Sequence, residues 1–135
     1  MDDTLRVAIE RWLIKADNDI VTARTMLATD PPVTDTASFH AQQCAEKCLK
    51  AYLVFAGIHV RRTHDLADLL IPCEGLDAEF GSLRTWAQDL TDYAVSSRYP
   101  DDWREIPVGE ARAAVEKAAS IMSFVQERLN PHLQR

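Results

Sequence analysis

The chain has 135 residues, of which 47% are hydrophobic and 27% charged, and its formal net charge at pH 7 is −6. A chain of this length makes about one domain, and this composition excludes a disordered or fibrous protein. The net negative charge excludes a protein that coats polyanions over its whole surface, because long-range repulsion would oppose their approach.

Two long amphipathic helices are predicted in the first half of the chain. Apolar residues recur at helical spacing up to Leu27, and Pro31-Pro32 forbids continuation. The second helix is expected to begin near Thr36 or Ser38, which are both good caps, and to run to Gly57. Its apolar face is expected to point inward, and its other face to present Gln43, Glu46, Lys47 and Lys50.

A short third helix is predicted over residues 64–70. Thr63 is a suitable N-cap, and Asp65 near the helix start suits the positive end of the helix dipole. Pro72 and Gly75 mark the expected end of this helix.

Two further long helices complete the predicted fold. The fourth is expected over residues 77–97, with Pro100 fixing where it stops, and the last begins at Pro107 and is closed by Asn130-Pro131. No segment alternates between apolar and polar residues at period two, so a sheet is not expected. We therefore predict an all-α, up-and-down bundle of about five helices, four long and one short, that forms a single domain over residues 1–135.

The cysteine content indicates a reducing compartment. Cys44, Cys48 and Cys73 are odd in number, and the first two lie one helical turn apart, which does not fit a secreted disulfide framework. His40, Cys44 and Cys48 form a row that could hold a metal, yet a fourth ligand at a recognisable spacing is missing. We interpret the cysteines as small buried thiols and expect no metal and no cofactor.

No membrane-spanning segment is predicted. The longest uncharged apolar run, Ala51 to Val60, is shorter than the about 20 residues that cross a bilayer, and the acidic N-terminus lacks the basic start of a signal peptide. We expect a cytoplasmic protein that does not associate with membranes.

Positive charge is concentrated in one region despite the acidic total. From His40 to His64 the chain carries one anion, Glu46, and four cations, which are Lys47, Lys50, Arg61 and Arg62. Any phosphate-binding site is therefore expected in this region and its spatial neighbours. The alternative interpretation is a solvated helix face followed by a basic loop.

Several short motifs along the chain, taken in order, resemble one family. The second-helix pattern Q-x-x-E-K-x-x-K-A is present as Gln43, Glu46, Lys47, Lys50 and Ala51. It is preceded by Trp12, Ala16, Asp19 and Ala23, and followed by Thr63-His64-Asp65-Leu66 and Arg98-Tyr99-Pro100. Together these motifs resemble the HEPN domain, an all-helical family whose members bind nucleotides or RNA and often pair with a small nucleotidyltransferase.

The resemblance implies a function and a set of site residues. It implies a homodimer with a polar groove between the subunits, acting in a toxin–antitoxin-like pair with a small nucleotidyltransferase. On this basis a nucleotide or RNA is expected to bind through Lys47, Lys50, His64 and Arg98.

The catalytic motif of the family's ribonucleases is broken in this sequence. Those members use R-x(4 to 6)-H, but the positions that follow Arg98 at these spacings are Trp103, Arg104 and Glu105. The expected function is therefore that of a noncatalytic binding or adaptor subunit. The alternative is a ribonuclease toxin with a degenerate motif, in which His64 approaches Arg98 in the folded dimer.

A third class of function rests on the adjacent pair His64-Asp65. Adjacent histidine and aspartate ligands hold the metal of HD-type phosphohydrolases. That class also needs an upstream histidine and a distant aspartate around the ion, and this chain is short for the fold.

In some toxin members of the HEPN family, the partnered nucleotidyltransferase modifies a tyrosine shortly after the catalytic histidine. Tyr99 follows Arg98 directly and does not occupy that position, so we do not assign it as a modification site.

Overall fold

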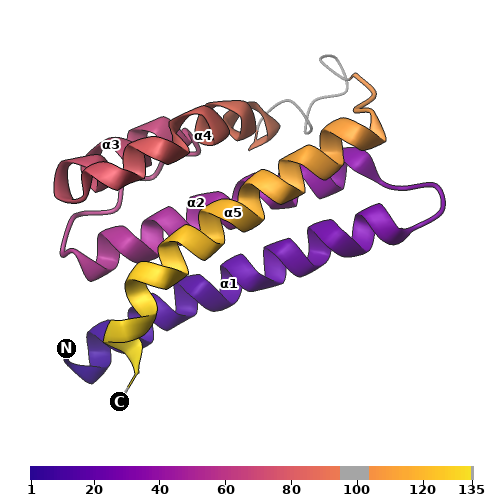
Figure 1. Cartoon of the computed structure of the whole chain (residues 1–135). Coiled ribbons are helices and arrows are strands. Elements are labelled where there is room, and N and C mark those ends of the chain that lie inside the picture. The colour runs from indigo at the N-terminus through magenta and orange to yellow at the C-terminus, as the bar shows by residue number, and fades with distance from the viewer. Residues whose placement is uncertain (95–103, 135) are drawn as a thin grey trace.

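The computed structural model of the chain describes residues 1–94 and 104–134. Within these ranges the chain forms five α-helices, two short 3-10 helices and no strand, which confirms the predicted all-α bundle. The long helices α1, α2 and α5 run side by side, and α3 and α4 form a second layer against them (Figure 1). Buried side chains from all five α-helices form one hydrophobic cluster.

Helices α1 and α2 follow the predicted pattern closely. Helix α1 spans Asp3–Ala28, and helix α2 spans Thr34–Phe55, two residues earlier than the first predicted cap. Gly57 follows α2 with a φ of 74°, a conformation that glycine adopts without steric cost, so it ends the helix as predicted.

The predicted bounds of the third helix are wrong at both ends. Asp65, not Thr63, is the N-cap, because its side chain accepts a hydrogen bond from the Ala67 amide at 2.9 Å. Helix α3 then spans Leu66–Leu76 and runs through Pro72. Proline removes one backbone donor, but Leu70 and Cys73 on either side are buried in the core, and this packing keeps the helix continuous.

The predicted fourth helix is divided into three pieces. A 3-10 helix, η1 (Ala78–Leu83), precedes α4 (Arg84–Thr91), and a second one, η2 (Asp92–Ala94), follows it. The expected core stripe is nevertheless correct, because all five of its members are buried: Phe80, Leu83, Ala87, Leu90 and Ala94. Residues 95–97 of the predicted helix lie outside the described residues.

Helix α5 begins where the sequence predicts and ends later. Pro107 is its N-cap, and the helix spans Val108–Leu133, so that Pro131 lies inside its last turn. Leu129 is fully buried and anchors this turn. The chain termini lie at the same end of the bundle (Figure 1). Among the described residues, no helix is both long enough and apolar enough to cross a membrane.

Candidate functional site

The predicted polar face of α2 is largely buried. Glu46 is only 3% exposed and Lys50 only 9%, and the neighbouring Gln42 is fully buried. The expectation of a solvent-facing stripe is therefore wrong for Glu46 and Lys50. The reason is that α2 is the central helix, in contact with α1, α3, α4 and α5.

Asp19 of α1 is the centre of a first charge network. Its carboxylate is nearly buried, and Oδ1 lies 2.8 Å from Nδ1 of His40. Oδ2 accepts a hydrogen bond from Nζ of Lys47. A carboxylate in this position must be paired, since burial of an isolated charge is very costly. The positive charge of Lys47 is therefore compensated mainly by Asp19.

Glu46 of α2 is the centre of a second network. Its Oε1 lies 2.8 Å from Nδ1 of His64, and its Oε2 accepts a hydrogen bond from Nζ of Lys50 at 3.1 Å. The amide of Gln42 donates to the backbone carbonyl of His64 at 2.9 Å and so fixes the loop that carries this histidine. The His64 side chain is 53% exposed, and its second ring nitrogen, Nε2, is the one left for a ligand.

Trp12 connects the Glu46 network to the surface. The Nζ of Lys50 lies 5.6 Å from the centroid of the Trp12 ring, within the range of a cation–π contact. A shallow pocket of about 280 Å³ lies against the same ring, and it is lined by Ala8, Arg11, Trp12 and Lys15. We call this pocket, together with the two charge networks, the polar seam. It is defined by Arg11, Trp12, Lys15, Asp19, His40, Glu46, Lys47, Lys50 and His64.

The polar seam contains three of the four predicted site residues. Lys50 and His64 share Glu46, and Lys47 lies one turn earlier on α2. Arg98, the fourth, lies outside the described residues, as does Tyr99.

Residues on both sides of the segment that carries Arg98 converge on α5. Arg104 donates two hydrogen bonds to Glu110, at 3.2 and 2.6 Å, and the hydroxyl of Tyr93 donates to the same carboxylate at 2.6 Å. These hydrogen bonds lower the pKa of Glu110, and the contribution of Arg104 is larger than that of Tyr93. Burial raises the pKa of the Tyr93 hydroxyl, and the hydrogen bond to Glu110 raises it further. The carboxylate therefore stays ionised and holds both flanks of the segment at the first turn of α5.

The cysteines are buried free thiols, as predicted. A hydrogen bond with Cys44, together with burial, raises the pKa of Cys48, and burial raises the pKa of Cys73 to about 12. Within residues 1–94 and 104–134 there is no group of histidine, cysteine or acidic side chains that could hold a metal. His64 and Asp65 face different partners, since one contacts Glu46 and the other caps α3.

Comparison with known proteins identifies the family of this chain. Residues 9–129 match the profile of the HEPN domain. The chain belongs to the HEPN domain family. The chain is also similar to the crystal structure of TT1696 from Thermus thermophilus, with 31% sequence identity and a TM-score of 0.77. The match covers 90% of this chain and 98% of that chain. No curated protein gives a significant match.

A second solved structure is described by its title as an archaeal HEPN homologue, ST0689. It shares 28% sequence identity with this chain, with a TM-score of 0.70, and the match covers 90% of this chain and 97% of that protein. Both similarities extend over most of the HEPN bundle and not over one motif alone.

Several residues of the polar seam were not predicted as part of a site. The sequence places Trp12 and Asp19 only in the family's opening pattern, and it gives no binding role to Arg11 or Lys15. The sequence does carry a signal for Asp19, because it falls within the buried stripe of α1 that also contains Ala16 and Ile20. A carboxylate at a core-facing position requires a cationic partner, which here is Lys47.

Proposed function

We propose that this protein is a noncatalytic HEPN subunit that binds a nucleotide or RNA through the polar seam. The observation that carries this proposal is the side-by-side placement of an aromatic ring, Trp12, and exposed cations, Arg11 and Lys15, along one pocket. Bases stack on aromatic rings, and phosphates pair with cations, so this combination fits a nucleotide better than a plain anion. Lys47, Lys50, His64 and Arg98 are the family-derived part of the same proposed site.

In this proposal the buried carboxylates act as positioning residues. Glu46 holds His64 by one ring nitrogen and leaves the other for a phosphate or base, while Lys50 lies over the Trp12 ring. Asp19 likewise fixes His40 and Lys47. A preorganised site loses less side-chain entropy when the ligand binds.

The proposed cellular setting follows the family. The protein acts in the cytoplasm as a homodimer, and pairs with a small nucleotidyltransferase in a toxin–antitoxin-like system. The noncatalytic assignment is supported by Trp103, Arg104 and Glu105, which stand where the ribonuclease members carry histidine after the arginine. Copurification with the neighbouring gene product, if it encodes a nucleotidyltransferase, tests the partnership.

Binding of a short single-stranded RNA and of mononucleotides tests the main proposal. The double variant Arg11→Ala, Lys15→Ala is expected to bind about tenfold more weakly and to show a shallower salt dependence, because two phosphate contacts are lost. Arg84→Ala is a control for the loss of one exposed cation outside the polar seam. Because Arg84 pairs with Glu74 at 2.6 Å, the fold of this variant is checked by circular dichroism. Equal affinity of the double variant and the wild type would refute a site at the polar seam.

A ribonuclease is the second candidate function, and one observation favours it. The Nδ1 of His64 lies 2.8 Å from the buried carboxylate of Glu46, an arrangement that orients an imidazole as a general base. In this case purified protein cleaves RNA, and cleavage is lost in both His64→Ala and Arg98→Ala. Cleavage that persists in both variants would come from a contaminating nuclease.

A further inference from the structure

A depression between α1 and α5 lies apart from the polar seam. Its volume is about 450 Å³, and it is lined by Arg24, Leu27, Ala28, Arg112, Val115 and Glu116. Small-molecule pockets occupy about 300–1,000 Å³, so the volume suits a small ligand. Arg24 comes nine residues after Lys15 on α1, which on a regular helix is about 13.5 Å further along the axis and on the opposite side. The depression and the Trp12 pocket are therefore separate sites.

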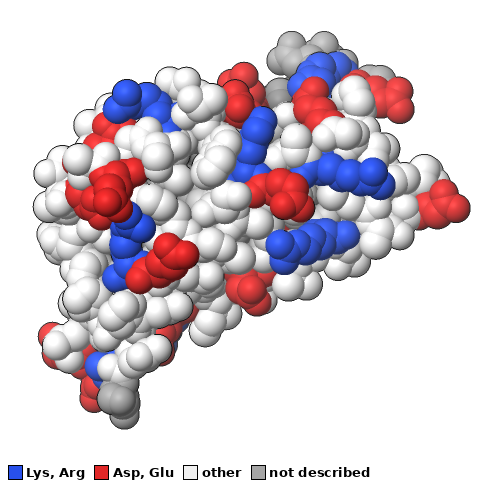
Figure 2. Space-filling view, in the orientation of Figure 1, with Lys and Arg blue, Asp and Glu red and all other residues white. Residues whose placement is uncertain are grey.

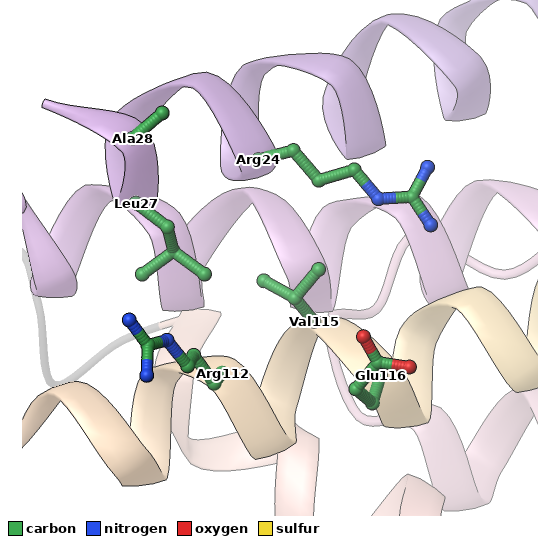
Figure 3. Close-up of a pocket in the computed structure, with 6 residues that line it drawn as sticks. All are labelled: Arg24, Leu27, Ala28, Arg112, Val115 and Glu116. Carbon is green, nitrogen blue, oxygen red and sulfur yellow. The ribbon is translucent and has the colours of Figure 1, made fainter.

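The two helices contribute matching positions to the lining. Helix α1 supplies residues 24, 27 and 28, and helix α5 supplies residues 112, 115 and 116. Residues with this spacing share one face of a helix, so each helix directs one arginine and one branched apolar side chain to the same space. Figure 3 shows Leu27 and Val115 pointing into the space between the helices, with one arginine side chain extending from each helix beside them.

The floor of the depression is apolar. Val115 is only 3% exposed, and Leu27 is half-buried and packs against the core. Ala28 is exposed, and its single methyl group leaves room above these side chains. A hydrocarbon group placed here loses contact with water, which stabilises the complex in proportion to the apolar area buried.

The two arginines of the depression lack a protein counter-charge among the described residues. Arg24 and Arg112 are both exposed, and neither forms an ion pair with any other described residue. Glu116 comes four residues after Arg112, but an acidic residue placed after a basic one is the less favourable order on a helix. Figure 3 shows the Arg112 guanidinium on the Leu27 side of the depression and Glu116 on the other side.

The charges of the lining favour an anion that carries one negative charge. Two arginines and one glutamate leave a single net positive charge around the depression. Figure 2 shows basic side chains on both sides of acidic ones over the part of α1 and α5 near the start of α5. Glu116 repels a second negative charge on a ligand, whereas a monoanion can contact the arginines and leave its uncharged part near Glu116.

We propose that this depression binds a small monocarboxylate that carries an aliphatic group. The planar fork of a guanidinium matches a carboxylate through two parallel hydrogen bonds, so Arg24 and Arg112 hold the charged end. The aliphatic group covers Leu27 and Val115. This site does not depend on nucleotide or RNA binding at the polar seam.

A nuclear magnetic resonance titration of the full chain with hexanoate tests this site. Saturable shifts are expected for the Nε–H signals of Arg24 and Arg112 and for the methyl signals of Val115. Acetate, which keeps the charge without the chain, is expected to bind about tenfold more weakly, because two or more methylene groups are no longer buried. Hexanamide, which keeps the chain without the charge, is expected to lose a similar factor, because the charge-assisted hydrogen bonds are lost.

Paired variants locate the binding on α1 and α5. The double variant Arg24→Gln, Arg112→Gln is expected to bind hexanoate about tenfold more weakly or worse. The double variant Arg11→Gln, Lys15→Gln is the matched control, since it removes two cations from the other side of α1 and is expected to keep the affinity for hexanoate within about twofold. Circular dichroism checks that both variants keep the helical content of the wild type.

Three results would overturn the proposal. The first is the absence of saturable shifts at these residues up to about 20 mM hexanoate. The second is equal affinity for hexanoate and for either acetate or hexanamide, which would remove the aliphatic carboxylate as the ligand class. The third is unchanged affinity in Arg24→Gln, Arg112→Gln. None of these results depends on whether RNA binds, so they are distinguishable from a failure of the proposed function.

Discussion

Two acidic side chains, Asp19 and Glu46, connect the stability of the protein to its candidate site. Each is almost fully buried and is paired with one lysine and one histidine. The desolvation of such a carboxylate is offset only when its partners are all present. The arrangement therefore fixes the orientation of the same cations that we propose bind a ligand.

Replacing Glu46 with glutamine tests this role at the level of one residue. Glu46→Gln is expected to lower the free energy of unfolding by about 3 kcal/mol, because it leaves the Lys50 ammonium without its buried counter-charge. Chemical denaturation measures the change. Glu127→Gln, an exposed position on α5, is the control and is expected to change stability by less than about 0.5 kcal/mol. Equal stability of the two variants would contradict the buried pairing.

At the level of helices, the sequence predicts the elements better than their ends. The periodic apolar residues of α1, α2 and α5 identify these helices because core packing follows the same spacing. The errors at the C-terminal ends of α3 and α5 fall at Pro72 and Pro131, where buried neighbours override a local helix breaker. The polar seam was only partly predictable, since the pairing of Asp19 with Lys47 depends on how α1 packs against α2.

The N-cap of α3 provides a test at this scale. Asp65→Ala is expected to lower the free energy of unfolding by about 1 kcal/mol, because the first turn loses the bond from the Ala67 amide to the Asp65 carboxylate. Thermal or urea denaturation measures the change, with Glu105→Ala as a control at an exposed position. If Asp65→Ala matches the control, the cap does not stabilise the helix.

The contact of Glu110 with Arg104 and Tyr93 predicts a pH dependence. Since these bonds lower the pKa of Glu110 in the folded state, their stabilisation is present above its unfolded pKa, about 4.3, and is lost as the pH falls through the lower folded value. Wild type and Glu110→Gln should therefore differ most in stability near pH 7 and converge toward pH 3. A difference that grows on acidification would contradict the assigned sign.

At the level of the whole molecule, the protein is acidic, but some of its exposed cations are concentrated in one place. The formal charge of −6 opposes polyanions at long range, while Arg11 and Lys15 lie exposed beside Trp12 on one side of α1. The local concentration of cations, and not the net charge, therefore decides whether a polyanion binds at this side of α1.

The most direct test of the central claim is a nuclear magnetic resonance titration of the wild-type protein with a short single-stranded RNA and with mononucleotides. The proposed function predicts that the indole N–H signal of Trp12 and the ring signals of His64 shift most, in a saturable way, and that added salt reverses the shifts. The absence of shifts at these two residues up to millimolar ligand, or saturable shifts confined to another surface, would contradict ligand binding at the polar seam.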